Sequence, residues 1–197
     1  MNWLRVGFVI AGVVLASIFS LSALADGVPT LSISPASSTV GAGSNVVLDV
    51  NIANVTDLFA FQFDLSFASG TVSAASIGEG AFLAGGGTTA FIPGTIDNVG
   101  GTIAATADTL IGPGPGVNGS GTLAVLTLTG LAPGTSSIDF SSVFLLDSNL
   151  TGINSSLQSG SVTVTSTAVP EPNTLVLLIA GMSLLASRFL RKTCFLA

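Results

Sequence analysis

The sequence predicts an all-β fold, a single antiparallel β-sandwich placed between two hydrophobic ends of the chain. Three observations predict it. Several short segments alternate apolar with polar or small side chains, which is the pattern of half-buried strands. Connections rich in glycine and proline separate these segments, as they do in antiparallel sandwiches. Residues 28–166 contain all of them, and this length suits one domain with a two-layer core.

The first element is a predicted secretory signal peptide over residues 1–25. Arg5 supplies a positive charge before an apolar run, and the small residues Ala23 and Ala25 then form an A-x-A cleavage site. We expect cleavage after Ala25, which leaves Asp26 as the mature N-terminus. The alternative is a retained N-terminal anchor, and the A-x-A site directly after the apolar run favours cleavage.

The strand pattern is clearest over residues 58–67, where every second side chain is large and apolar. This face consists of Phe59, Phe61, Phe63, Leu65 and Phe67. Further half-buried strands are predicted by Leu31 and Ile33, by Val46, Leu48, Val50 and Ile52, by Ile138 and Phe140, and by Val162 and Val164. The alternative, a disordered stalk, is disfavoured because these faces bury apolar surface that opposes chain entropy.

Four segments rich in glycine and proline are predicted to connect the strands, namely residues 40–45, 85–87, 97–101 and 112–116. Glycine permits a positive φ, and proline lacks the N–H that a strand ladder needs. Both residue types therefore favour turns and loops over strand interiors.

The last hydrophobic segment, residues 174–190, is predicted to be a transmembrane helix, because about 17 apolar residues suffice for a short span. Arg188, Arg191 and Lys192 then form a stop-transfer signal that leaves residues 191–197 as a cytoplasmic basic tail. The alternative is a buried core helix. Such a helix would alternate polar and apolar faces, whereas this segment is apolar all round.

The charges separate cleanly along the chain. All four basic residues flank the hydrophobic ends, and all ten acidic residues lie between Asp26 and Glu171. The positive-inside rule therefore places the ends in the cytoplasm and the acidic middle outside. A surface of this sign repels nucleic acid and anionic lipid headgroups, so we expect neither as a partner.

The composition excludes most classes of catalytic site. Residues 26–171 contain no His, Cys, Lys, Arg or Tyr, so nucleophile-base triads, Schiff bases and His-ligated zinc have no components. A carboxylate pair for glycoside hydrolysis remains, with Asp64 and Glu79 or Asp97 and Asp108 as candidates. Their spacing is that of ordinary surface acids, and we expect a protein without enzymatic activity.

Glycan binding by aromatic stacking has few candidate residues. The one Trp is Trp3 in the signal peptide, and the chain has no Tyr. Phe82, Phe91 and Phe144 are the remaining candidates, although core packing is the expected role for phenylalanine.

Calcium is the one cofactor for which the sequence offers ligands. Asp147, Asn149 and Thr151 match alternating positions of a helix-loop-helix calcium loop, with Gly152 at the sharp turn. Gln158 stands where a bidentate Glu is wanted, and no helices are predicted to flank the segment. A plain turn is therefore the favoured interpretation.

The C-terminal region runs Ala168-Val169-Pro170-Glu171-Pro172, then the apolar segment, then Arg188-Phe189-Leu190-Arg191-Lys192. This three-part order resembles a PEP-CTERM sorting signal, a motif of Gram-negative bacteria that make extracellular polysaccharide. The resemblance implies processing by an exosortase-type enzyme near Pro170, Glu171 and Pro172, within a linker over residues 167–173. We expect Pro-Glu-Pro to be stiff, extended and exposed, which suits the groove of a processing enzyme.

Three stretches of the domain carry a second likeness, namely residues 58–67, Ile77-Gly78-Glu79-Gly80 and residues 119–128. Through them the domain resembles the cohesin family over about residues 30–165. The resemblance implies a jelly-roll sandwich of about nine strands. Cohesins bind dockerin modules and are related to carbohydrate-binding modules. No dockerin-contacting residue is carried over.

These features together predict a non-enzymatic protein that is exported across the inner membrane, anchored at its C-terminus and delivered to the cell surface or extracellular matrix. The expected partners are an exosortase-type enzyme, the membrane around the C-terminal helix, and a dockerin-like protein or a polysaccharide. The alternative function is a carbohydrate-binding module for polysaccharide.

Overall fold

The computed structural model describes residues 27–166, 178 and 180–183. The predicted signal peptide with Ala23 and Ala25, the sorting motif Pro170, Glu171 and Pro172, and the stop-transfer residues Arg188, Arg191 and Lys192 lie outside the described residues. Of the predicted transmembrane segment, residues 178 and 180–183 are described, and they are helical. No helix in the described part of the chain is long and apolar enough to span a membrane.

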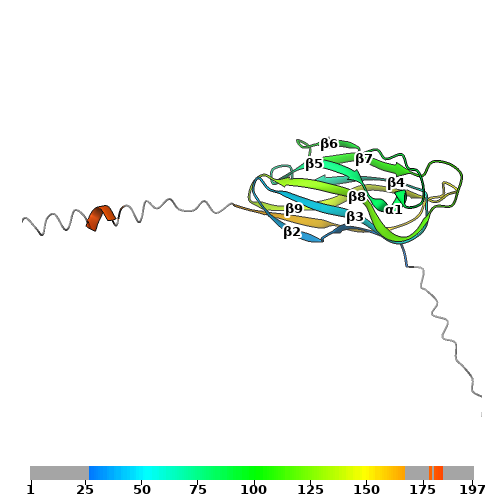
Figure 1. Ribbon diagram of the computed structural model, residues 1–197, viewed down its shortest axis with the longest axis horizontal. Coiled ribbons are helices and arrows are strands. Elements are labelled where there is room, and N and C mark those ends of the chain that lie inside the picture. Colours follow the sequence, from blue (N-terminus) through cyan, green and yellow to red (C-terminus); the bar gives the residue numbers. More distant parts are fainter. Residues whose placement is uncertain (1–26, 167–177, 179, 184–197) are drawn as a thin grey trace, which may run out of the picture.

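Eleven strands and one short helix make up the domain (Figure 1). In chain order they are β1 (Thr30–Ser34), β2 (Ser37–Gly41), β3 (Asn45–Leu58), β4 (Ala60–Phe67), β5 (Val72–Glu79), α1 (Ala81–Ala84), β6 (Thr95–Asp97), β7 (Thr102–Thr109), β8 (Val117–Gly130), β9 (Gly134–Leu146), β10 (Ser156–Gln158) and β11 (Gly160–Thr165). The four predicted connections fall at breaks or turns between these elements.

The strands form two sheets, which confirms the predicted sandwich. One sheet has the order β10-β1-β3-β8-β5, and the other has the order β2-β11-β9-β4-β7-β6. The prediction of a wholly antiparallel fold is wrong at two pairs, because β1 runs parallel to β10 and β2 runs parallel to β11. These pairs close the sandwich by joining the first strands to the last. The two strands beyond the implied nine are accounted for by the three-residue β6 and β10.

The core lies between the two sheets and includes the alternating faces that the sequence predicts, together with side chains of β5, β7 and β8 that it did not single out. Leu48, Val50 and Ile52 of β3 are buried, as are the inward residues of β4. Phe63 has no exposed surface, and its ring stacks on Phe61 at 5.7 Å between centroids. Leu, Ile and Val side chains from both sheets make up most of the rest of this core.

The predicted strand over residues 58–67 is in fact divided at Phe59. β3 ends at Leu58 in the five-stranded sheet, and β4 begins at Ala60 in the six-stranded sheet. The Phe59 N–H donates to the Leu146 carbonyl, and the Phe59 carbonyl accepts from the Leu110 N–H. The chain thus crosses between sheets here, and the alternation of buried side chains is interrupted: Leu58 is buried, Phe59 is only partly buried, and the alternation restarts at Phe61.

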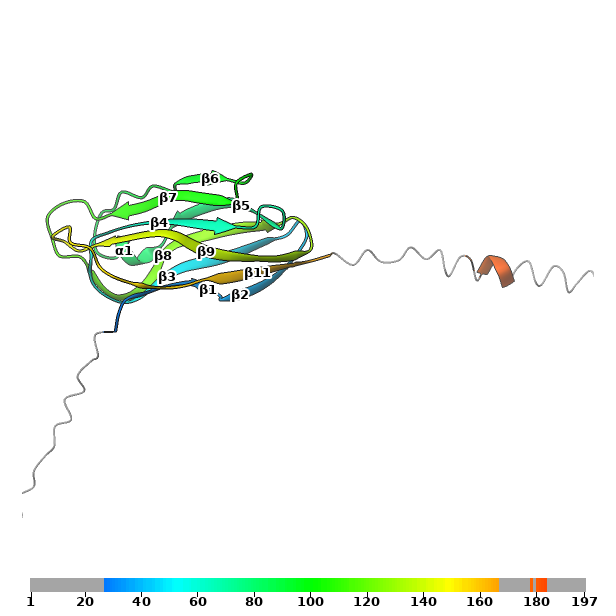
Figure 2. The ribbon, with the colours of Figure 1, turned by 180° about the vertical axis from the view of Figure 1, so that it is seen from behind.

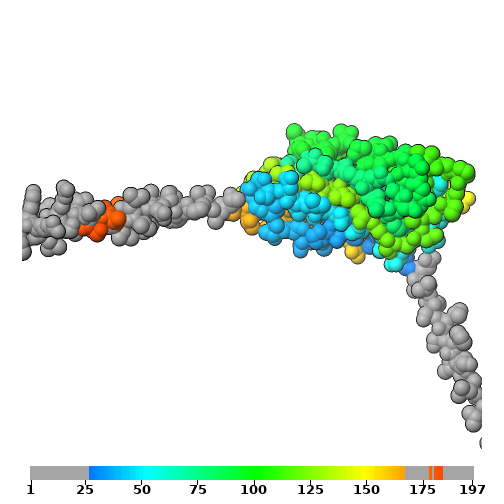
Figure 3. Space-filling view, in the orientation of Figure 1, coloured from blue at the N-terminus to red at the C-terminus, as the bar shows by residue number. Residues whose placement is uncertain are grey.

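The domain is elongated along its strands, as the ribbon seen from behind and the space-filling view both show (Figures 2 and 3). β11 leaves the domain at the end where Val164 pairs with Gly134, the first residue of β9. Leu146, the last residue of β9, lies at the opposite end of the same long strand.

Candidate binding groove on the six-stranded sheet

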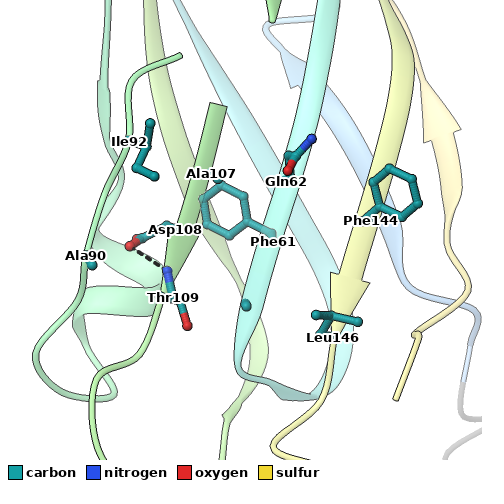
Figure 4. A pocket seen from close by; sticks show the side chains of 10 residues that line it. Phe61, Gln62, Ala90, Ile92, Ala107, Asp108, Thr109, Phe144 and Leu146 are labelled. Atoms are coloured by element: carbon teal, nitrogen blue, oxygen red, sulfur yellow. Dashed lines mark hydrogen bonds between the residues drawn. The ribbon is translucent and has the colours of Figure 1, made fainter. Parts of the chain in front are cut away.

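A groove of about 380 Å³ lies on the outer face of β4, β7 and β9 (Figure 4). The strand register places its residues in two rows across the sheet. Gln62 of β4 pairs with Ala107 of β7 and with Phe144 of β9. The next row contains Ala60, Thr109 and Leu146. Ala60, Ala107 and Thr109 thus form a low floor beside Gln62, and larger apolar side chains stand at its margin.

Phe144 and Ile92 form opposite walls of the groove, with 61% and 57% of their surface exposed. Ile92 belongs to residues 88–93, which pair with the free side of β7 here: the Ile92 N–H donates to the Ala107 carbonyl at 2.8 Å, and the Ala107 N–H donates back at 3.0 Å. Exposed apolar side chains gathered beside polar ones are typical of interaction sites.

The expectation that Phe144 packs in the core is wrong, and a β-bulge explains why. The pairing of β4 with β9 shifts between Asp64 and Leu65, so that Ser141 has no partner. Phe140 before the bulge faces inward and meets Phe63 edge to face at 6.0 Å. After the extra residue the alternation is reversed, and Phe144 points to solvent.

The other two candidate stacking residues lie elsewhere. Phe82 in α1 is partly buried against the core, as expected, and Phe91 is half-buried in the segment beside β7. Neither lines the groove.

Carboxylates occupy the outer face of this sheet beyond the groove. Asp64 on β4 accepts a hydrogen bond from the Ala105 N–H at 2.7 Å. Hydroxyls of Ser159 and Ser137 lower the pKa of Asp139 on β9. Residues 27–166 contain no Lys, Arg or His, so these charges have no neutralising cation within the domain. The face therefore combines an apolar groove with a negative field.

The two carboxylate pairs considered from the sequence are not the pair that the structure forms. Asp97 caps its own turn, where the Gly100 and Val99 N–H groups donate to it and lower its pKa. Asp64 lies on the outer face of the six-stranded sheet, whereas Glu79 ends a strand of the other sheet. Instead, Asp108 and Glu79 are close enough to interact.

Asp108 is buried, and its interpretation as an ordinary surface acid is wrong. It pairs with Phe61 on the inner face of the sheet and is only 2% exposed. Thr106 and Leu110, two residues away on either side, are buried as well. Burial of every second residue is the sequence signal that could have placed Asp108 inside, but the bulge between Ile103 and Thr106 interrupts it.

The predicted calcium ligands lie in the loop after β9. Asp147 Oδ1 accepts hydrogen bonds from the Asn149 N–H at 2.9 Å and the Thr151 N–H at 2.7 Å, as in an Asx turn. In the part of the chain that the structure describes, no three His, Cys, Asp or Glu side chains are grouped to hold a metal ion. Calcium binding by Asp147, Asn149 and Thr151 stays a prediction.

Asp57 is a structural residue that no sequence pattern indicated. Its carboxylate accepts from the Ser148 hydroxyl at 2.7 Å and the Gly116 N–H at 2.5 Å, and its own N–H donates to Asn118. The Ser148 and Gly116 bonds lower the pKa of Asp57. The residue has a φ of 59° and ties the end of β3 to two loops at the groove end of the domain.

Comparison with known proteins identifies the family to which the domain belongs. The family model described as "Cohesin domain" matches residues 30–164. No curated protein matches the sequence. A cohesin from a Clostridium thermocellum cohesin-dockerin complex is 15% identical with a TM-score of 0.59, covering 71% of this chain and 100% of its own. A non-cellulosomal cohesin from Archaeoglobus fulgidus is 13% identical with a TM-score of 0.57, covering 71% and 93%.

A third similar structure is a cohesin from Acetivibrio cellulolyticus, solved in complex with a dockerin. It is 20% identical, has a TM-score of 0.56 and covers 69% of this chain and 98% of its own. At these identities the likeness shows the fold, and the family model identifies the domain. The chain belongs to the cohesin family, whose domains are non-catalytic modules that bind other proteins.

Proposed function

We propose that this chain is a non-enzymatic docking protein, exported and then displayed at the cell surface or in the extracellular matrix. The docking part of the proposal rests on the groove between Phe144 and Ile92. Its walls expose apolar side chains, and the low floor between them leaves room for a side chain of the partner. The export part rests on the two hydrophobic ends and on the acidic domain between them.

The proposed partner is a dockerin-like protein that presents an apolar side chain flanked by basic ones. Cohesins of the same fold have been solved as complexes with dockerins. The apolar side chain fills the groove, and the basic side chains meet the field of Asp64 and Asp139. Such charge complementarity steers association and makes it sensitive to salt.

Capture from solubilised cell envelope and secreted matrix tests the docking surface. Phe144→Asp places a charge in the apolar groove and is expected to reduce the captured partner about tenfold or more. The matched control is Val47→Asp, because Val47 is 54% exposed on β3 of the other sheet. Equal capture by wild type and Phe144→Asp would contradict docking at the groove.

A second candidate function, polysaccharide binding, is favoured by one observation. The exposed ring of Phe144 lies beside Gln62, so an aromatic face and an amide are available to the same sugar ring. The same capture experiment separates the two candidates: a bound protein supports docking, and a bound glycan that Phe144→Asp loses supports polysaccharide binding.

Mass spectrometry of the mature protein from each cell fraction tests export and sorting. We expect an N-terminus at Asp26 and, after processing near Pro170, Glu171 and Pro172, loss of residues 173–197 in the surface or matrix fraction. Retention of residues 173–197 in every fraction would contradict sorting by an exosortase-type enzyme and leave the docking proposal standing.

A further inference from the structure

We propose that a proton shared by Asp108 and Glu79 controls the groove. When the two side chains share the proton, they hold in place the segment that carries Ile92, one wall of the groove. When both carboxylates are ionised, they repel, and this segment becomes more mobile. The effect on partner binding rests on the proposed docking function. The effect on the wall does not, because it follows from the geometry of the domain alone.

The pair bridges the two sheets. Asp108 belongs to β7 in the six-stranded sheet, and Glu79 is the last residue of β5 in the other. Asp108 is 2% exposed; its Oδ1 accepts from the Thr109 N–H at 2.8 Å, while its Oδ2 has no hydrogen-bond partner among the described residues. Glu79 is the charged group that faces it, and residues 27–166 supply no cation.

The wall segment is attached to both halves of this pair. The Thr89 hydroxyl donates to Glu79 Oε1 at 2.5 Å. The next residue, Ala90, donates its N–H to the carbonyl of Thr109, which directly follows Asp108. Figure 4 shows Asp108 between β7 and the segment that carries Ala90 and Ile92. A change in the separation of the two carboxylates is therefore transmitted to the segment that ends in Ile92.

Protonation changes the sign of the interaction within the pair. Burial, and next the negative charge of Glu79, raise the pKa of Asp108 to about 6, against the smaller lowering effect of the Thr109 and Ala90 N–H groups. Below that pH the protonated Asp108 can donate a hydrogen bond to the Glu79 carboxylate. Above it the buried, ionised Asp108 faces the carboxylate of Glu79, which is itself exposed to solvent, and the two repel.

The direction of the pH dependence follows from linkage. The native state binds the proton of Asp108 more tightly than the unfolded chain, whose Asp has a pKa of 3.8. The stabilisation is therefore complete below about pH 4 and is lost as the pH rises through about 6. We therefore expect the segment that carries Ile92, and with it the groove, to be well ordered at mildly acidic pH and less well ordered at neutral pH.

Hydrogen exchange on the full chain tests whether protonation controls the wall, and it needs no partner. The amides of Ala90 and Ile92, which bond to Thr109 and Ala107, report on the wall. After correction for intrinsic exchange, we expect their protection to fall about tenfold between about pH 5 and about pH 7.5. Asp108→Asn, which mimics the protonated acid, is expected to keep high protection at both pH values. Unchanged wild-type protection would overturn the proposal.

Two further variants keep the test decisive. Glu79→Gln retains Asp108 but removes the facing charge, so the fall in protection should become smaller and move to lower pH. Asp139→Asn is the control, because Asp139 has a lowered pKa and should leave the wild-type profile unchanged. A Glu79→Gln profile identical to wild type would overturn the role of the pair. Failure of Phe144→Asp to reduce capture would overturn the docking proposal only.

Discussion

Phe63→Ala is expected to lower the free energy of unfolding by about 3–5 kcal/mol. Phe63 is fully buried, stacks on Phe61 and meets Phe140 edge to face, so truncation removes both ring contacts and leaves a cavity between the sheets. Urea unfolding followed by circular dichroism measures the change. The domain has no disulfide that would hold the two sheets together after this loss.

Phe144→Ala is the matched control, because Phe144 lies on a strand of the same sheet but is 61% exposed. We expect its unfolding free energy to stay within about 0.5 kcal/mol of wild type. Equal destabilisation by the two substitutions would mean that the inward and outward assignments along β4 and β9 are wrong.

Gly80→Ala is expected to destabilise the domain by about 3 kcal/mol. A Cβ at Gly80 would collide with the backbone carbonyl of Thr122 and lie 2.6 Å from the carbonyl carbon of Leu123. The backbone has little freedom to move away, because the Gly80 N–H donates to the Leu123 carbonyl at 2.9 Å. Thermal unfolding of the variant measures the effect as a lowered midpoint temperature.

Gly78→Ala provides the comparison two residues earlier in the same stretch. No atom lies within 4 Å of a Cβ built at Gly78, so this substitution should change stability by less than about 0.5 kcal/mol. A large loss at Gly78, or none at Gly80, would contradict the close approach of the β5 end to β8.

The sandwich was predictable because side chains on a strand alternate between faces. Phe61, Phe63 and Leu65 are buried in the register that their spacing predicts. The parallel pairing of β1 with β10 and of β2 with β11 was not predictable from spacing, because it joins residues about 125 positions apart in the sequence. Nothing local to either strand specifies its partner.

The groove was harder to predict, because β-bulges reverse the alternation on which the sequence argument depends. Phe144 was expected inside and is outside, and Asp108 was expected outside and is inside. Each follows a register shift in its own strand. Ile92, the other wall, comes from a segment without strand periodicity, and only its hydrogen bonds to Ala107 bring it to the site.

Photo-crosslinking from position 144 tests the central claim, docking of a protein partner in the groove, most directly. A photoreactive phenylalanine analogue at this position preserves the aromatic wall, and the same analogue at position 47 reports on the opposite sheet. With envelope and matrix fractions as the source of partner, we expect a covalent adduct with one protein from position 144 and none from position 47. Crosslinking from position 47 alone, or equally from both positions, would contradict docking in the groove.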